Sequence, residues 1–388
     1  MYSKQMAITF DDNIRMVDLH TQYCRLKEEI DAAIQEVLNS HAYINGPQVT
    51  TFANHLADYL NIPHVIPCAN GTDAIQIALM ALQLQAGDEV IVPAFNYVAA
   101  TEATALLGMT PVLVDVNPDT FNIDAQKIEQ AISRRTKAII AVHLFGQSCD
   151  MEPILRIAEK YNLSVIEDNA QSIGAVYTFA SGETKKAGTI GQIGTTSFFP
   201  SKPLACYGDG GALITSGDEL SERIRMIANH GQDIKYRHKY IGCNSRLDTI
   251  QAAILNVKLK YISELTKTRI KVAKQYNEAF KCLPYIITPY KAPFSTHVYH
   301  QYTIRVQGEK RNDLQSYLRQ KGIPSMVYYP IPMDMQEAFR MHARKTDNLS
   351  VARQLSESVL SLPIHSEMRD DMQEYIIEHV KRFFKITG

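Results

Sequence analysis

From about residue 60 onward, short apolar runs typical of strands alternate with segments whose apolar residues have helical spacing. Short runs rich in β-branched and other apolar residues predict seven strands: Val65–Cys68, Glu89–Phe95, Pro111–Val116, Ala138–Phe145, Ser164–Asn169, Thr195–Phe199 and Gly211–Thr215. Apolar residues at helical spacing lie between most of these runs, at Asp73–Leu84, Tyr97–Leu107, Ala125–Ser133 and Met151–Tyr161. Strands and helices that alternate at this length predict an α/β fold with a mainly parallel seven-stranded sheet and helices on both faces.

The segments on either side of the predicted sheet are mainly helical. The expected helices before it are Tyr23–Leu38 and Gln48–Tyr59. The elements expected after it are a long helix Leu247–Phe280, strands Tyr302–Val306 and Ser325–Tyr329, and helices Arg311–Gln320, Asn348–Val359 and Arg369–Phe384. The stretch 177–194, rich in Gly, Thr, Ser and Lys, is expected to run over the surface. We predict an N-terminal helical segment (1–60), a large domain (61–255) and a smaller α+β domain (256–388).

Charge and composition restrict the class of protein. The 388 residues hold 40 Lys and Arg against 41 Asp and Glu, so no overall field draws the chain to nucleic acid or to an anionic membrane. The longest apolar stretch is too short to span a bilayer, and residues 1–12 lack the apolar core of a secretory signal. The six cysteines are scattered singly, and no ligand spacing typical of a metal site occurs. We expect a cytoplasmic enzyme without a metal.

The first candidate for chemistry is A-N-G-T-D at residues 69–73, which follows a predicted strand and opens a predicted helix. Glycine lets the backbone approach a ligand, and the free N–H groups of a helix N-terminus attract anions. The segment is therefore a candidate anion seat. The alternative is an ordinary helix cap formed by Thr72 or Asp73.

The second candidate is a hydrophobic strand that ends in two consecutive acids, Glu167 and Asp168, with Gln171 three residues beyond. Ligands of open α/β sheets bind beyond the carboxyl ends of the strands. Because side chains alternate along a strand, one acid can face that crevice while the other faces away. The alternative is that the acids serve as helix caps.

The third candidate is Lys202, which stands between Pro200 and Pro203 after a predicted strand and just before the glycine-rich turn 208–211. An unperturbed lysine has a pKa of about 10.4, so an amine nucleophile must be desolvated or placed near positive charge. The alternative is a lysine that only carries surface charge. No dinucleotide fingerprint or G-K-[ST] phosphate loop occurs in the chain.

Together the three segments match the requirements of pyridoxal 5'-phosphate. That cofactor needs an anion seat for its phosphate, a carboxylate against its pyridinium nitrogen and an amine for the Schiff base. The chain order of seat, acid and lysine on one α/β sheet fits these requirements. The acid keeps the ring nitrogen protonated, which makes the ring an electron sink.

Specific motifs connect the chain to a known family. They are A-N-G-T-D-A, P-A-F-N-Y-V-A, V-D-V-N-P-D-T-F-N-I-D, E-D-N-A-Q, S-F-F-P-S-K-P-L and G-C-N-S-R-L-D-T-I-Q-A-A. On these motifs the chain resembles the DegT/StrS-type nucleotide-sugar aminotransferases, which are fold type I pyridoxal phosphate enzymes. The resemblance covers nearly the whole chain, from residue 41 to residue 363. It implies a large cofactor domain and a smaller α+β C-terminal domain.

The resemblance assigns roles around the cofactor ring. It implies that Lys202 forms the Schiff base and that Asp168 is the partner of the pyridinium nitrogen. By the same correspondence, Gln171 contacts the ring from the turn after Asp168, and Tyr97 stacks on it.

The resemblance also assigns the phosphate contacts and a role for a second subunit. Gly71, Thr72 and Ser197 match the phosphate contacts of the family. Asn244 matches a residue that the family lends to the cofactor site of the neighbouring subunit. This implies a homodimer with shared active sites.

The basic stretch 230–246 is the expected binding region for the nucleotide diphosphate of the substrate, because a nearly neutral chain needs a local patch for an anionic ligand. The family interpretation is a loop that crosses the dimer interface, and the alternative is a solvated loop. Expected substrate-binding residues are His230, Arg246, Tyr328 and Tyr329. Arg246 is a candidate partner for a sugar carboxylate.

Within the family, the motifs S-F-F-P-S-K-P-L-x-C-Y-G-D-G-G-A, H-G-Q-D and Y-P-I-P most resemble enzymes that aminate C3 of UDP-linked 2-acetamido-2-deoxy-3-oxo-glucuronate. Such enzymes usually have His-Tyr where this chain has Tyr328-Tyr329, and the lost cation weakens the case for a carboxylated sugar. The implied activity is transfer of an amino group from L-glutamate to C3 or C4 of a UDP- or TDP-linked ketosugar. The product would be an aminosugar for cell-surface polysaccharide such as O-antigen.

Two other functions remain open at this point. Some relatives are pyridoxal phosphate-dependent sugar dehydratases, but those carry His in place of the lysine, and Lys202 argues against that activity. The other alternative is a non-catalytic regulatory homologue that binds the cofactor.

Overall fold

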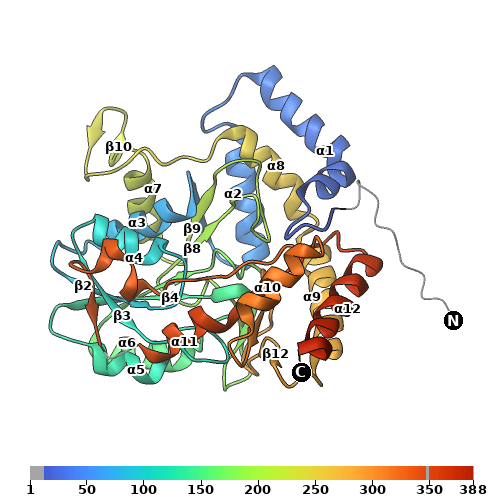
Figure 1. The fold of residues 1–388 in the computed structure, drawn as a ribbon. Coiled ribbons are helices and arrows are strands. Elements are labelled where there is room, and N and C mark those ends of the chain that lie inside the picture. Colours follow the sequence, from blue (N-terminus) through green and yellow to red (C-terminus); the bar gives the residue numbers. More distant parts are fainter. Residues whose placement is uncertain (1–12, 347–348, 388) are drawn as a thin grey trace.

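An eight-stranded sheet forms the centre of the part of the chain that the structure describes (Figure 1). The structure is a computed structural model and describes residues 13–346 and 349–387. In pairing order the strands are β1 (His64–Cys68), β9 (Gly211–Thr215), β8 (Ile193–Ser197), β5 (Ser164–Asp168), β4 (Thr136–Val142), β2 (Glu89–Pro93), β3 (Thr110–Val114) and β14 (Arg344–Lys345). Strand β9 is antiparallel to both of its neighbours, and the other pairs are parallel. The predicted α/β class and mainly parallel sheet are confirmed.

The eighth strand, β14, was not predicted. It contributes only two residues, which pair in parallel with β3, and two residues are too few to show a hydrophobic pattern. A buried carboxylate anchors this strand: Arg344 Nη2 donates to Glu89 Oε2 at 2.9 Å, and Glu89 is 1% exposed. The edge strand β14 is thus anchored by a contact between residues that are 255 positions apart in the sequence.

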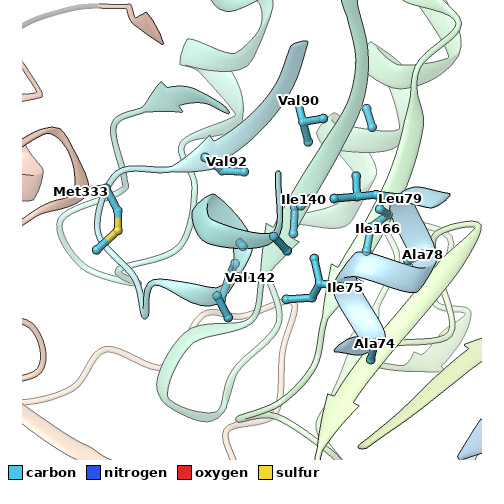
Figure 2. Packing of buried hydrophobic residues seen from close by; sticks show 14 of the residues in the cluster. Ala74, Ile75, Ala78, Leu79, Val90, Val92, Ile140, Val142, Ile166 and Met333 are labelled. Carbon is cyan, nitrogen blue, oxygen red and sulfur yellow. The ribbon is translucent and has the colours of Figure 1, made fainter. Parts of the chain in front are cut away.

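Helices cover both faces of the sheet, as the alternation of buried residues requires. Val90 and Val92 on β2 face one hydrophobic cluster, whereas Ile91 faces another. Figure 2 shows α3 packed against β2, β4 and β5 in the first cluster. The helices of that face are α3 (Gly71–Ala81), α4 (Ala99–Leu106), α7 (Asp218–Ala228) and α11 (Ser350–Ser358). Those of the other face are α2 (Pro47–Leu60), α5 (Ala125–Ala131), α6 (Met151–Tyr161) and α8 (Thr249–Leu259).

The helix expected over Leu247–Phe280 is in fact two helices. Helix α8 ends at Leu259, and α9 (Ile262–Phe280) begins after the break at Lys260-Tyr261. Helix α8 packs on α1 (Leu19–Ser40), whereas α9 belongs to a separate core. The apolar periodicity continues through the break, so the sequence pattern did not reveal it.

The C-terminal part has its own core around a three-stranded sheet. Its strands are β12 (Ile286–Ile287), β13 (Tyr302–Val306) and β15 (Val359–Leu362), and its helices are α9, α10 (Arg311–Gln320) and α12 (Asp370–Thr387). The strand predicted at Ser325–Tyr329 is wrong, since only Met326 forms an isolated bridge, with Ser361. The predicted helix Asn348–Val359 corresponds to α11, which begins at Ser350, and Asn348 lies outside the described residues.

The C-terminal part also reaches back to the large sheet. Met333, Phe339 and Leu355 pack in the first cluster, beside α3 and α4. This brings residues 327–346 and 349–359 over the edge of the large sheet, where they can line a site. The division at residues 60 and 255 stays a prediction.

The stretch 177–194 is only in part a surface excursion. It contains a hairpin of β6 (Val176–Thr178) and β7 (Thr184–Lys186), but Tyr177 is buried. A second hairpin, β10 (Gln232–Ile234) with β11 (Arg237–His238), stands out at the upper left of Figure 1 beside α7. Among the described helices, none is both long enough and apolar enough to cross a membrane.

Candidate active site

A cavity of about 600 Å³ opens at the carboxyl ends of β4, β5 and β8. Nine of the residues predicted from the sequence line it: Gly71, Thr72, Tyr97, Asp168, Gln171, Ser197, Lys202, Tyr328 and Tyr329. They come from strand ends and helix starts of the large sheet and from the segment after α10. The structure thus brings the three candidate segments together in one place.

One wall of the cavity is the N-terminus of α3. Asn70 caps this helix through its side-chain oxygen, which accepts from the Asp73 N–H at 2.8 Å. A Cβ added at Gly71 would lie 2.6 Å from Cβ of Ser197, so only glycine lets the helix start so close to the end of β8. The free N–H groups and hydroxyls at this wall suit an anion.

The two acids at the end of β5 face opposite ways, as the alternation predicted. Asp168 lines the cavity, whereas Glu167 is fully buried behind it. Burial raises the pKa of Asp168, while the Ala170 N–H at 3.0 Å and the Lys202 ammonium act in the other direction. A carboxylate in this setting is ready to pair with a cationic group in the cavity.

Lys202 projects into the same cavity from the turn that follows β8. Its backbone N–H donates to the carbonyl of Phe199 at 2.8 Å, which fixes the turn. Burial lowers the pKa of Lys202, and the Asp168 carboxylate opposes that shift. A desolvated lysine gives a larger fraction of the neutral, nucleophilic amine at neutral pH than an exposed one.

The side chain of Gln171 is held at both ends. Its Oε1 accepts from the Phe145 N–H at 2.8 Å, and its Nε2 donates to Tyr329 Oη at 3.1 Å. Burial raises the pKa of Tyr329, so its hydroxyl stays protonated. The ring of Tyr97 lies 6.1 Å from that of Tyr329, and 57% of Tyr97 is exposed at the cavity mouth.

His300 and Gln301 are among the cavity-lining residues that sequence reasoning missed. Burial, together with the Lys202 and Arg269 cations, lowers the pKa of His300 well below the usual value, so the imidazole is neutral. Arg269 on α9 holds the backbone at His300 in place. Its Nη1 donates to the carbonyl of Ile364 at 3.0 Å and to that of His300 at 3.4 Å. Only the chemical type of His300 marked it in the sequence, since no strand-end or helix-start pattern surrounds it.

Three predicted residues lie outside the cavity, on the segment 229–246. His230 and Asn244 are exposed, and the Asn229–Asn244 bridge holds the base of the β10–β11 hairpin. Arg246 is partly buried, with Nη1 3.5 Å from Asn229 Oδ1. Their roles in binding stay predictions.

Comparison with known proteins now decides the family. Residues 24–381 match the family model described as DegT/DnrJ/EryC1/StrS aminotransferase family. The chain belongs to this aminotransferase family. The resemblance that the motifs carried is thereby confirmed.

Two curated relatives and one solved structure illustrate the match. The UDP-2-acetamido-2-deoxy-3-oxo-D-glucuronate aminotransferase of Pseudomonas aeruginosa is 48% identical over 91% of this chain and 95% of its own length. A pleiotropic regulatory protein of Geobacillus stearothermophilus is 44% identical over 96% and 99%. The crystal structure of NtdA from Bacillus subtilis with bound cofactor PMP is 32% identical, has a TM-score of 0.88 and covers 99% of this chain and 87% of its own.

The residues around the cavity fit the cofactor of this family, pyridoxal 5'-phosphate. The cofactor carries a phosphate, a basic ring nitrogen and an aldehyde. The α3 N-terminus beside Ser197 suits the phosphate, the Asp168 carboxylate suits the protonated nitrogen, and the Lys202 amine suits the aldehyde. One chain therefore supplies a seat for the phosphate, a carboxylate for the ring nitrogen and an amine for the aldehyde.

Proposed function

We propose that this aminotransferase transfers an amino group from L-glutamate to the keto carbon, C3 or C4, of a nucleotide-linked ketosugar. The nucleotide is UDP or TDP, and the product serves cell-surface polysaccharide biosynthesis in the cytoplasm. The observation that carries the proposal is the meeting of Lys202, Asp168 and the α3 N-terminus around one cavity.

Each residue has a defined task in this proposal. When bound, pyridoxal phosphate supplies the electron sink and carries the amino group between the two substrates. Gly71, Thr72 and Ser197 bind its phosphate, and Asp168 holds the proton on the ring nitrogen. Lys202 moves a proton between the substrate carbon and its own Nζ, as general base and then as general acid.

The substrate assignment rests on the cavity and on the relatives. The cavity extends from the cofactor residues to Tyr328 and Tyr329, which we propose contact the sugar. The curated relative from Pseudomonas aeruginosa is named for a UDP-linked 3-oxo sugar. Arg246 and His230, on the basic segment 230–246, are proposed to bind the nucleotide diphosphate or a sugar carboxylate.

We further propose a homodimer in which Asn244 completes the site of the partner subunit. Its support is the surface of the segment 229–246, where Ile234 and Tyr236 of the β10–β11 hairpin and Ile241 just after it are 58%, 82% and 86% exposed. Large apolar side chains gathered on one projecting element are typical of an interface. Asn244 lies at the base of that hairpin.

Two alternatives make different predictions. A sugar dehydratase of this family would carry His at the position of Lys202. A regulatory role is suggested by the name of the relative from Geobacillus stearothermophilus. A regulatory homologue would bind the cofactor without turning over any ketosugar.

The test is turnover of a panel of UDP-, TDP- and GDP-linked ketosugars with L-glutamate, followed by mass spectrometry. An aminosugar from one member of the panel, absent with Lys202→Ala, is the expected result. Bound cofactor without any aminosugar would favour regulation, and loss of water from the sugar would favour a dehydratase.

A further inference from the structure

The structure contains a buried network of hydrogen bonds directly behind Asp168. Glu167 and His143 are both inaccessible to solvent and do not line the cavity, and His143 Nε2 lies 2.7 Å from Glu167 Oε2. A carboxylate in a core is costly unless hydrogen bonds compensate it. The resemblance to the family assigned neither residue a role.

Glu167 has a full set of donors. Its Oε1 accepts from the N–H groups of Ile190 and Gly191, both at 2.6 Å, and its Oε2 accepts from the Gly188 N–H at 2.8 Å. Burial alone raises the pKa of Glu167, but these bonds and His143 outweigh it, so the pKa is lowered. Glu167 is therefore a carboxylate anion that ties the segment 188–191 to β5.

His143 continues the network to the end of β4. The Cys149 N–H donates to its Nδ1 at 3.0 Å, so Nδ1 carries no proton and Nε2–H donates to Glu167. The backbone N–H of His143 donates to the carbonyl of Asp168 at 3.0 Å. One residue thus connects the buried carboxylate with the backbone of the acid that faces the cavity.

The network also reaches the second cavity residue on this turn. Oγ of Ser172 donates to the carbonyl of His143 at 2.7 Å. The Phe145 N–H, two residues after His143, donates to Oε1 of Gln171 at 2.8 Å. Asp168 and Gln171 are therefore both held from behind by the turn that His143 begins.

We propose that Glu167 and His143 are positioning residues that hold the Asp168 carboxylate where it can pair with the cofactor's ring nitrogen. The inference rests on the proposed role of Asp168. If Glu167 and His143 only stabilise the fold, their loss weakens binding of every ligand of the cavity equally. If they act through Asp168, their loss affects only ligands that carry the ring nitrogen.

A pair of cofactors separates these cases. 1-Deazapyridoxal phosphate keeps the phosphate and aldehyde of pyridoxal phosphate but has carbon in place of the ring nitrogen. We expect Glu167→Gln to weaken binding of pyridoxal phosphate to the apoprotein about tenfold, a coupling of ordinary size between contacting polar groups. The dissociation constant of the deaza analogue should change less than about twofold, which is within the usual error of comparisons between variants. Dissociation constants come from titration of the visible absorption band.

Matched variants keep the test informative. Glu89→Gln alters another carboxylate that is 1% exposed, at the start of β2, where it accepts from Arg344 and does not line the cavity; it should leave both dissociation constants unchanged. His143→Gln keeps a donor near Nε2, whereas His143→Asn keeps only an acceptor near Nδ1 and should show the larger nitrogen-selective loss. These two variants decide the question if Glu167→Gln does not fold.

The outcomes are distinct. Equal weakening of both cofactors, or no weakening of either, in a folded variant would overturn the positioning role. Failure of the unaltered protein to bind pyridoxal phosphate would instead overturn the proposed function. A nitrogen-selective loss supports both.

Discussion

The amide of Gln171 donates to the hydroxyl of Tyr329 at 3.1 Å, although the two residues are 158 positions apart. This bond joins the turn after β5 to the segment that returns from the C-terminal part over the large sheet. The cavity is therefore closed by a contact between both parts of the chain. This bond would couple the proposed binding of a sugar beside Tyr329 to the proposed cofactor residues on the turn.

Tyr329→Phe should lower the free energy of unfolding by about 1–3 kcal/mol, because the buried Gln171 amide loses its acceptor. Denaturant titration measures this change. Tyr328→Phe is the matched control, since Tyr328 is the half-buried neighbour for which the described residues provide no hydrogen bond to the hydroxyl. Equal losses in the two variants would show that the bond contributes nothing specific.

Gly71→Ala should weaken binding of pyridoxal phosphate at least about tenfold, a cost of overpacking at the low end of the usual range. The added Cβ would stand 2.6 Å from Cβ of Ser197, so the helix start must shift away from the proposed phosphate seat. Cofactor titration of the apoprotein is the measurement. Gly217→Ala is the control, because its nearest neighbour would be Leu220 Cβ at an ordinary 3.5 Å. Unchanged affinity in Gly71→Ala would contradict the phosphate seat.

Three segments of the site were predictable because local sequence and strand topology determine them. Asp168, Lys202 and Gly71 each follow a short apolar run, and parallel strands bring such ends to one edge. His300 and Gln301 reach the cavity only through the packing of the C-terminal part, held by Arg269. No periodicity of the sequence encodes that contact.

The fold was likewise predictable where local sequence determines it, but not where contacts between distant residues do. All seven predicted strands of the large sheet form, because strands that are buried on both faces are rich in apolar residues along their whole length. The two-residue strand β14 depends on Glu89 and Arg344, which pair over a long sequence distance. The predicted strand at 325–329 contains apolar and aromatic residues because Tyr328 and Tyr329 line the cavity, not because they pair in a sheet.

The stability of the protein should fall as the pH drops below about 6.5, the ordinary pKa of histidine. Burial lowers the pKa of His297 to about 3, so the unfolded chain binds a proton that the folded chain does not between these values. The slope from one such residue is at most about 1.4 kcal/mol per pH unit, and the contribution of His297 is constant above that range.

His297→Asn should reduce this slope, because Asn keeps an acceptor for the Tyr299 N–H but cannot titrate. Denaturant titrations at pH 7.5 and pH 5 measure it. The exposed His55→Asn is the control. A variant whose stability falls as steeply as that of the unaltered protein would show that His297 is not a buried neutral imidazole.

Mixing two inactive variants tests the shared site. Lys202→Ala and Asn244→Ala each inactivate their homodimers if Asn244 serves the partner's cavity. After subunit exchange at equal amounts, half of the dimers are mixed and one of their two sites is intact, so activity should recover to about a quarter of the unaltered level. Sedimentation confirms that dimers form. Mixtures that stay inactive would contradict a site built from both subunits.

We propose that Lys202 mediates transfer of nitrogen from glutamate to a ketosugar in the cavity at the ends of β4, β5 and β8. Incubation with ¹⁵N-labelled L-glutamate and UDP-linked 2-acetamido-2-deoxy-3-oxo-glucuronate, with the corresponding TDP-linked 3- and 4-ketosugars alongside, tests it most directly by mass spectrometry. We expect an aminosugar that carries the heavy nitrogen, together with 2-oxoglutarate, and neither product with Lys202→Ala. Labelled aminosugar formed by Lys202→Ala at the unaltered rate would contradict it.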